Sequence, residues 1–232
     1  MRYTRTILCL ANSRKPPSGF CVAGREITSS GFGGWIRPIS ARPSAELSVS
    51  ERQYEDGSDP KLLDVISIEL CRRQPHLHQH ENHCIDGGYF WLKRDRVDWQ
   101  KLQTAVEDPG PTLWLNGCSS SHGVNDRVPE AMLSRFSRSL FLVRPQELKI
   151  IVASEESEFG GLRRRVRARF KLNGNWYLFP VTDPVIERMF LRGKDGESTL
   201  PEAVLCVSLG EVYHGYAYKL AASVITPLRA GL

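Results

Sequence analysis

Residues 162–181 read Leu-Arg-Arg-Arg-Val-Arg-Ala-Arg-Phe-Lys-Leu-Asn-Gly-Asn-Trp-Tyr-Leu-Phe-Pro-Val, and this stretch carries the strongest evidence on the fold. Charged and apolar residues alternate from Arg165 to Leu172, and Arg163 continues the charged face in the same period of two, which is the pattern of a half-buried strand. Asn173-Gly174 follows, and both residues tolerate the positive φ that a tight two-residue turn requires. The sequence therefore predicts a β-hairpin with Lys171 opposite Trp176, an apolar face and a cationic face.

The cationic face of this hairpin is a candidate nucleic-acid-binding surface. It comprises Arg163, Arg165, Arg167, Arg169 and Lys171 together with Trp176. Alternate residues of a strand project about 6.6–6.8 Å apart, close to the spacing of phosphates in an extended single strand, and Trp176 or Tyr177 can stack a base beside them. The alternative is a solvated face that discourages edge pairing and is partly neutralised by Glu155, Glu156 and Glu158. The sequence favours neither interpretation.

Further strand patterns lie on both sides of the hairpin. Apolar and polar residues alternate over 64–70, which predicts another half-buried strand. Short apolar runs bounded by turn residues predict strands at 6–11, 20–23, 148–152, 203–209 and 216–225, with a turn at 15–19. One helix is predicted from Asp98 to Asp108, and a second begins at Asp183-Pro184. The chain is therefore predicted to be mainly β, with a few short helices.

The length of 232 residues allows one large β domain or two small ones. Proline and a serine-rich loop follow the predicted helix at 98–108, which indicates a helix-bearing connection between two β-rich halves. We expect the boundary near residue 138, with an N-terminal domain at 1–138 and a C-terminal domain at 139–232.

The composition is that of an ordinary globular protein, with 41% hydrophobic and 25% charged residues. The net charge of +5 is a faint indication of an anionic partner. The apolar run near the N-terminus is too short for a signal peptide, and no stretch approaches the roughly 20 apolar residues of a membrane helix. We therefore expect a cytoplasmic protein without membrane contact. The six cysteines are scattered and form no CxxC pair, which predicts reduced thiols and no structural zinc.

One group of residues superficially matches a nuclease site. Glu147-Leu-Lys149, with Asp126 upstream, has the Asp…Glu-x-Lys order with which many nucleases hold Mg²⁺ and orient water. Three such residues also occur by chance in most proteins, as solvated charges at a strand end. Asp126, Glu147 and Lys149 are therefore weak catalytic candidates.

Other polar clusters are weaker still. The histidines at 76, 78, 80 and 83, with Cys84, suggest metal ligands, but a polar loop after Pro75 is the favoured interpretation. Cys118 with His122 lacks an orienting third group, and Glu211, His214 and Lys219 are better explained as a satisfied turn. No metal, cofactor or catalytic residue is assigned.

Several short clusters together resemble the bacterial dual OB-fold domain family. They are Cys9-Leu-Ala-Asn-Ser-Arg-Lys15, Cys21-Val-Ala-Gly24, Gly34-Trp-Ile-Arg-Pro38, Glu81-Asn82, Asn125-Asp-Arg-Val128, Thr182-Asp-Pro184, Ser208-Leu-Gly-Glu211 and Tyr218-Lys-Leu220. The resemblance covers both halves and implies two small OB-like five-stranded barrels that bind nucleic acid within bacterial conflict or defence systems. It implies no catalytic residues, and the arginine-rich strand lies outside the pattern.

Three functions remain open on this evidence, and the first is the leading hypothesis. The first is a module that binds single-stranded DNA or RNA through the cationic face. The second is a metal-dependent nuclease that uses Asp126, Glu147 and Lys149. The third is an accessory subunit that binds a partner protein or a small nucleotide.

Overall fold

The computed structural model describes residues 2–15, 18–156 and 160–231. It is mostly β, with 52% strand and 12% helix, and contains a closed five-stranded barrel and a half-barrel. The prediction of OB-like barrels with few helices is confirmed. No helix in these described ranges is long and apolar enough to cross a membrane. The predicted turn at 15–19 includes residues 16 and 17, which lie outside the described residues. Glu158, one of the carboxylates expected to neutralise the cationic face partly, also lies outside them.

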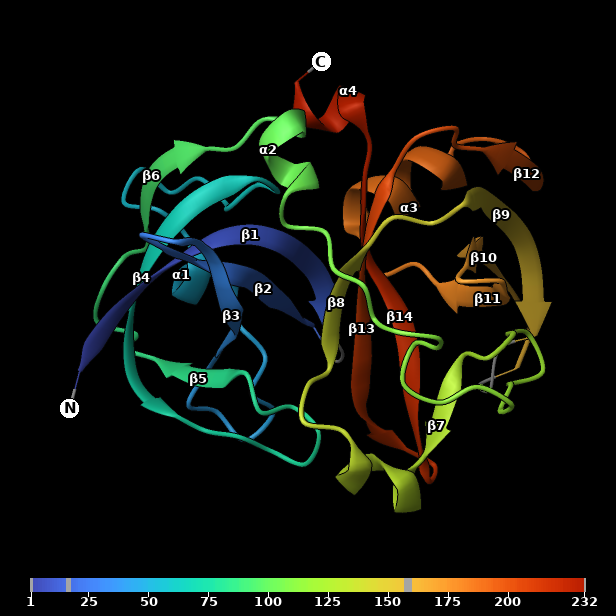
Figure 1. Cartoon of the computed structure of the whole chain (residues 1–232), viewed down its shortest axis with the longest axis horizontal. Helices are drawn as coiled ribbons and strands as arrows, with labels where there is room; N and C mark the ends of the chain where they lie inside the picture. Colours follow the sequence, from blue (N-terminus) through green and yellow to red (C-terminus); the bar gives the residue numbers. More distant parts are fainter. Residues whose placement is uncertain (1, 16–17, 157–159, 232) are drawn as a thin grey trace. The chain divides into compact units, whose positions relative to one another are not determined.

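The chain forms two compact units, coloured along the sequence in Figure 1. The first contains Met1–Ala105, Ser137–Ser139 and Pro227–Leu232, and the second contains Val106–Phe136 and Leu140–Thr226. The division at residues 105 and 106 differs from the boundary expected near 138. The reason is that the connection buries its apolar side chains, including Leu113, Trp114 and Leu133, in the second unit's core.

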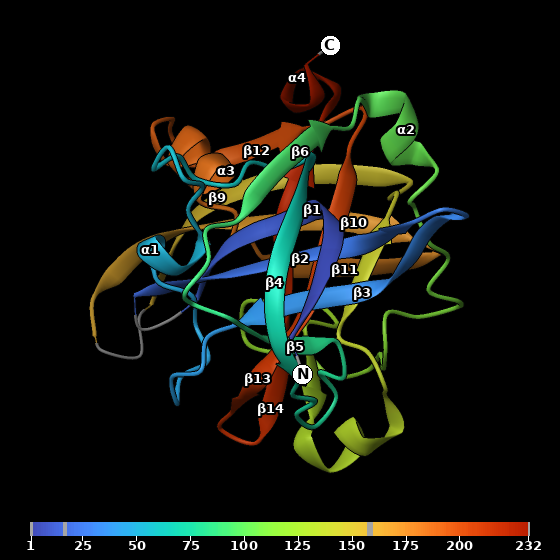
Figure 2. The ribbon, with the colours of Figure 1, turned by 90° about the vertical axis from the view of Figure 1, so that its left-hand side faces the viewer.

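The first unit is the closed barrel. Its strands are β1 (Tyr3–Lys15), β2 (Gly19–Thr28), β3 (Gly31–Ile39), β4 (Asp64–Arg73) and β5 (Asn82–Ile85), with β6 (Leu92–Arg96) added beside β4. They are paired in the order β1-β2-β3-β5-β4, and β4 pairs again with β1, which closes the barrel. The β3–β5 pair is parallel and the others are antiparallel. Figure 2 shows β4 of this unit crossing β1, β2 and β3.

Strong curvature of β1 and β2 requires a residue without a side chain. The register of this pair shifts between Cys9 and Ala11, as in a β-bulge. A Cβ at Gly24 would lie 2.1 Å from the carbonyl oxygen of Leu8, so only glycine permits this approach of the two backbones. Ile7 and Leu8 are fully buried beside it.

Three short helices belong to the first unit: α1 (Val49–Arg52), α2 (Trp99–Gln103) and α4 (Pro227–Ala230). Asp98 caps α2 as predicted, since its carboxylate accepts a hydrogen bond from Lys101 N at 2.7 Å. The helix ends at Gln103, five residues before the predicted end. It cannot continue because Glu107 N donates instead to Leu142 O, at 2.7 Å.

The second unit contains two four-stranded sheets. One has the order β11-β10-β9-β12 and the other β7-β14-β13-β8. The elements are β7 (Arg127–Pro129), the 3₁₀ helix η1 (Glu130–Arg135), β8 (Leu140–Val143), β9 (Glu147–Glu156), β10 (Leu162–Leu172), β11 (Asn175–Pro180), α3 (Pro184–Leu191), β12 (Gly196–Thr199), β13 (Val204–Tyr213) and β14 (Tyr216–Ile225). Asp183 caps α3, as predicted. The predicted hairpin register is confirmed, with Lys171 opposite Trp176 and Phe170 opposite Tyr177.

The two units share a strand topology, as the resemblance to the dual OB-fold family implies. In each, three strands in sequence are joined as antiparallel neighbours, a short helix follows the third strand, and two later strands pair with each other, β4 with β5 and β13 with β14. Strands β6 and β12 are additional edge strands. The parallel β3–β5 pair of the first unit has a counterpart in the parallel bridge between Val181 and Ala221. Strands β9, β10, β11, β13 and β14 therefore correspond to β1–β5. The second unit stays open because β13 pairs with β8 rather than with β9.

Candidate nucleic-acid interface

The alternation in β10 separates its side chains onto two faces. Val166, Ala168, Phe170 and Leu172 are buried, and the five cations of the cationic face point outward. Phe170 packs against Tyr177 and Phe179, with ring centroids 5.1–5.4 Å apart, and this aromatic cluster anchors the hairpin on its inner side. Burial of the apolar face is what forces the cations onto one outer surface.

Arg167 is bound by a carboxylate of the neighbouring strand. Its Nε and Nη2 atoms lie 2.5 and 2.8 Å from the two carboxylate oxygens of Glu155, a two-point contact between half-buried side chains. Burial acts to raise the pKa of Glu155, but the hydrogen bonds and charge of Arg167 outweigh it and leave that pKa below its ordinary value. Arg167 is therefore already neutralised.

Two further cations of the cationic face have exposed partners. Arg169 lies 3.8 Å from Glu197 on β12, which also contacts Lys149 at 2.9 Å, and Lys171 lies 3.8 Å from Glu147. Exposed ion pairs of this kind typically contribute about 0–1 kcal/mol to stability. A phosphate can replace such a carboxylate at little cost.

Arg163 and Arg165 differ from the other cations. Both are exposed, and no carboxylate pairs with either among residues 2–15, 18–156 and 160–231. They follow Gly160 and Gly161, whose φ angles of 82° and 80° are accessible at little cost only to glycine. The first half of β10 therefore presents two cations that form no ion pair within the described chain, although Arg163 lies opposite Glu155 and the charge of Arg165 also lowers the pKa of Glu155.

Trp176 lies at the other end of the cationic face. Its side chain is 38% exposed, and the Arg169 guanidinium carbon and Lys171 Nζ lie 4.9 and 5.9 Å from its ring centroid. The backbone beneath it is held by Asn125, whose Nδ2 donates to Trp176 O at 3.0 Å. Cations beside an indole orient the ring and leave exposed aromatic surface for a base.

Tyr177 does not belong to this surface, and its prediction as a stacking residue is wrong. The side chain is 1% exposed and stacks on Phe170 in the core. Its hydroxyl accepts hydrogen bonds from Leu113 N at 3.2 Å and Asn116 Nδ2 at 3.1 Å. The reason is the period of the strand: neighbours of an outward Trp176 must point inward.

Lys219 is a buried cation whose position the sequence did not reveal. It is fully buried in β14, donates from Nζ to Leu115 O at 2.6 Å, and lies 5.6 Å from the Tyr177 ring centroid. Burial is the main cause that lowers its pKa to about 7. The Lys within an otherwise apolar strand was the available signal. His214 is exposed in the turn between β13 and β14, so it does not form the acid–base group considered above with the buried Lys219.

Of the three nuclease candidates, Asp126 is buried and the other two lie on the surface. Asp126 is 1% exposed, and its carboxylate accepts hydrogen bonds from Ser120 N at 2.7 Å and Ser120 Oγ at 2.5 Å. Glu147 and Lys149 instead lie on the outer surface of β9, where each has an ion-pair partner. The buried carboxylate therefore holds its own loop rather than joining the other two.

The histidine cluster is also divided. His78 is buried, His76 and His80 are exposed, and His83 Nδ1 shares a hydrogen bond of 2.7 Å with the Tyr3 hydroxyl. Burial, and then the charges of Arg73 and Arg5, lower the pKa of His83 to about 4. Within the described part of the chain, no three His, Cys, Asp or Glu side chains are grouped to hold a metal ion.

Comparison with known families agrees with this architecture. A family model described as a dual OB-containing domain matches residues 5–224. Neither the curated proteins nor the solved structures gave a match. The family match spans both units and almost the whole chain.

Proposed function

The chain belongs to the dual OB-containing domain family, and from this premise we propose that it binds single-stranded nucleic acid through the cationic face of β10 and β11. OB folds bind oligonucleotides on the face of their second and third strands. Strands β10 and β11 correspond to β2 and β3 of the closed barrel, so the cationic face occupies that position in the second unit.

The observation that carries this proposal is the combination of two arginines without an ion pair in the described chain and an exposed indole flanked by cations. Arg163 and Arg165 can contact phosphates without first losing a carboxylate partner of the described chain. Trp176 lies on β11 opposite Lys171 and can stack a base there. At about 3.3 Å per residue, Lys171 is roughly 26 Å from Arg163 and roughly 20 Å from Arg165 along β10. A single strand is favoured over a duplex because stacking needs an unpaired base.

The proposal has a quantitative signature in salt. Two to three phosphate contacts in a single strand give a slope of log K against log salt of about −1.4 to −2.1. Replacing both free arginines by glutamate should remove most of that slope. A role in bacterial conflict or defence stays a prediction from the family resemblance.

The test is fluorescence anisotropy with labelled single-stranded DNA and RNA across a salt series. We compare the wild-type protein with Arg163→Glu/Arg165→Glu and with a control of equal charge change, Arg188→Glu/Lys194→Glu, at exposed positions outside the cationic face. The proposal requires loss of binding in the first variant and not in the second. An equal loss of affinity in both variants, or a wild-type affinity that does not change with salt concentration, contradicts the proposal.

The accessory-subunit function is the second candidate, because three carboxylates on the surface already compensate part of its charge. A mixed surface of this kind can also bind an acidic partner protein. Co-purification of the wild-type chain with a protein partner and without nucleic acid would favour it. The buried Asp126 gives the nuclease hypothesis no support.

A further inference from the structure

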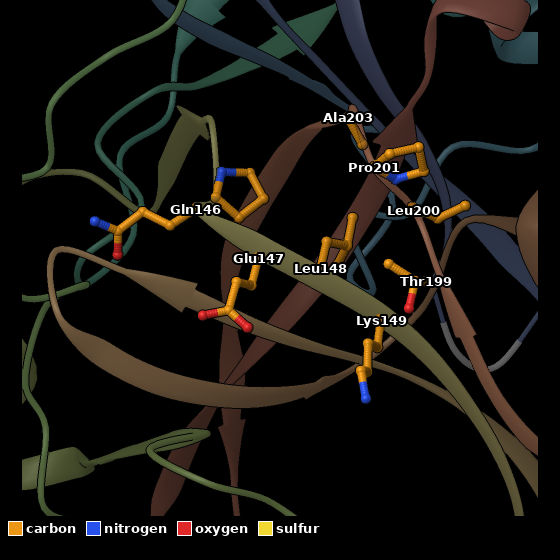
Figure 3. A pocket seen from close by; sticks show the side chains of 9 residues that line it. Gln146, Glu147, Leu148, Lys149, Thr199, Leu200, Pro201 and Ala203 are labelled. Atoms are coloured by element: carbon orange, nitrogen blue, oxygen red, sulfur yellow. The ribbon is translucent and has the colours of Figure 1, made fainter.

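A small pocket opens where β9 and the chain after β12 diverge (Figure 3). Thr199 pairs with Lys149, and Leu200 N donates to Leu148 O at 3.0 Å. Beyond this bond, Pro145 on one arm and Pro201 on the other lack the N–H that would extend the ladder. The two arms separate there and leave a volume of about 170 Å³.

The lining of the pocket combines apolar walls with a polar rim. Figure 3 shows Leu148 directed toward Ala203 and Pro201, and Glu147 and Lys149 directed the other way. Thr199 and Gln146 are the polar residues of the lining besides Glu147 and Lys149. The amide oxygen of Gln146 accepts a hydrogen bond from Gly174 N at 3.4 Å, which leaves its side-chain N–H groups as donors. Sites for drug-sized ligands usually have about 300–1,000 Å³, so this pocket fits a single planar ring rather than a larger molecule.

The rim of the pocket continues into the cationic face. Lys149 is exposed there and pairs with Glu197, the residue that also contacts Arg169. Glu147 lies 3.8 Å from Lys171, which is beside the Trp176 ring. An anionic backbone that passes Trp176 and Lys171 therefore reaches Lys149 at the mouth of the pocket.

We propose that this pocket binds one unpaired nucleobase of the same strand, with a flanking phosphate held by Lys149. This inference rests on the proposed function and adds a second base site on β9 and β12, away from the β10–β11 surface. The apolar walls contact the ring, the Thr199 hydroxyl donates to or accepts from its polar edge, and the Gln146 side-chain N–H donates to it. Base contacts of this kind carry preference for one base, whereas the cations do not.

The experiment scans the nucleic acid and the protein together. The ligand is the shortest oligothymidylate that binds the wild-type chain at full affinity, which prevents sliding, with a single abasic site placed at each position in turn. Affinities are measured for the wild type, Trp176→Ala and Thr199→Trp, whose indole would fill the pocket mouth. Ser30→Trp adds the same side chain at an exposed turn of the first unit and is the matched control.

We expect two abasic positions to weaken wild-type binding by roughly 5- to 150-fold each, the range typical of base stacking. Trp176→Ala should abolish sensitivity at one position, and Thr199→Trp should abolish it at the other. Ser30→Trp should retain the sensitivity to an abasic site at both positions. Gln146→Ala, at an exposed position, should reduce the second penalty and provides a readout if Thr199→Trp fails to fold.

The outcomes separate this inference from the function on which it rests. If the wild type binds but Thr199→Trp and Gln146→Ala keep its abasic profile, the base pocket is overturned and the cationic face stands. If Ser30→Trp also abolished the sensitivity of binding to an abasic site at the second position, the base pocket would be overturned as well. If the wild type binds no oligonucleotide, the proposed function itself fails.

Discussion

The corresponding hairpins of the two units, β2–β3 and β10–β11, use their arginines in opposite ways. In the first unit, Arg25 donates to Gly33 O at 2.6 Å and Phe32 O at 3.1 Å, and Arg37 is 4% exposed beside Glu81. In the second unit, Arg163 and Arg165 face solvent without a carboxylate partner in the described chain. An arginine in this fold is available to a ligand only where its own chain leaves it unsatisfied.

Segments distant in sequence supply the partners in the first unit. Arg25 Nη1 donates to Ala105 O at 3.4 Å, after α2, and Arg37 Nη2 donates to Ser139 Oγ at 2.7 Å. Ser139 Oγ donates in turn to Glu81. These contacts turn a strand pair that could bind a ligand into an internal support.

The largest expected effect comes from breaking this buried network. Arg37→Met leaves Glu81 buried without its cation, which should cost about 3–5 kcal/mol of unfolding free energy. Urea denaturation followed by circular dichroism measures it. The comparison supplies its own control, because Arg163→Met removes an exposed arginine and should change stability by only about 0.5 kcal/mol. Similar losses in both variants would contradict the contrast between the hairpins.

The buried cation of the second unit predicts a dependence on pH. The pKa of Lys219 is lowered to about 7 in the folded chain, against roughly 10.4 when unfolded. Between these values the unfolded state binds more protons, so unfolding free energy should rise with pH, by up to about 1.4 kcal/mol per pH unit. Below pH 7 both states are protonated and the dependence ends. Lys219→Met should remove this rise of unfolding free energy with pH. Urea titrations of both proteins at pH 7, 8 and 9 measure it, and the same rise in Lys219→Met would contradict the assignment to Lys219.

Neighbouring aromatic residues on opposite faces give a third test. Trp176→Ala should weaken binding of single strands by about 1–3 kcal/mol with little change in stability. Tyr177→Phe should leave affinity unchanged but cost about 1–3 kcal/mol of stability, because Leu113 N loses its buried acceptor. Anisotropy and thermal melts on both variants check the pair. An affinity loss in Tyr177→Phe equal to that in Trp176→Ala would refute the assignment of faces.

The smallest effect concerns the neutralised arginine. Glu155→Gln should free Arg167 for one more phosphate, which makes the salt slope steeper by about 0.7 and raises affinity a few-fold at low salt. Glu156→Gln removes the same charge from an exposed neighbour and is the control. A salt slope that stays constant in Glu155→Gln, or changes equally in Glu156→Gln, would show that Arg167 does not reach the strand.

Local patterns were sufficient for the hairpin and its caps. The alternation around Phe170 and the Asn173-Gly174 turn set the register, and Asp98 and Asp183 were identified as N-caps. Other predictions depended on contacts with distant residues. The helix after Asp98 was predicted too long because Glu107 pairs with β8, a partner 35 residues away.

The sequence correctly predicted which cations of the candidate site point outward, but not which of them are paired with carboxylates. Alternation identified the outward cations, but whether a cation is free depends on which carboxylate lies across the sheet. Arg167 and Arg163 are equivalent in pattern, yet only Arg167 is held by Glu155 in the folded chain. The pocket at Pro145 and Pro201 also required the fold, because 56 residues separate its two arms.

The sequence by itself determined which side chains of each strand face the core and which face solvent, because a period of two is a local property of the chain. It also determined where the main hairpin turns. Only the tertiary structure decided which arginines remain available, that Lys219 and Asp126 are buried, and that the second barrel stays open. The physical reason is that charge neutralisation and strand closure depend on partners brought together by folding.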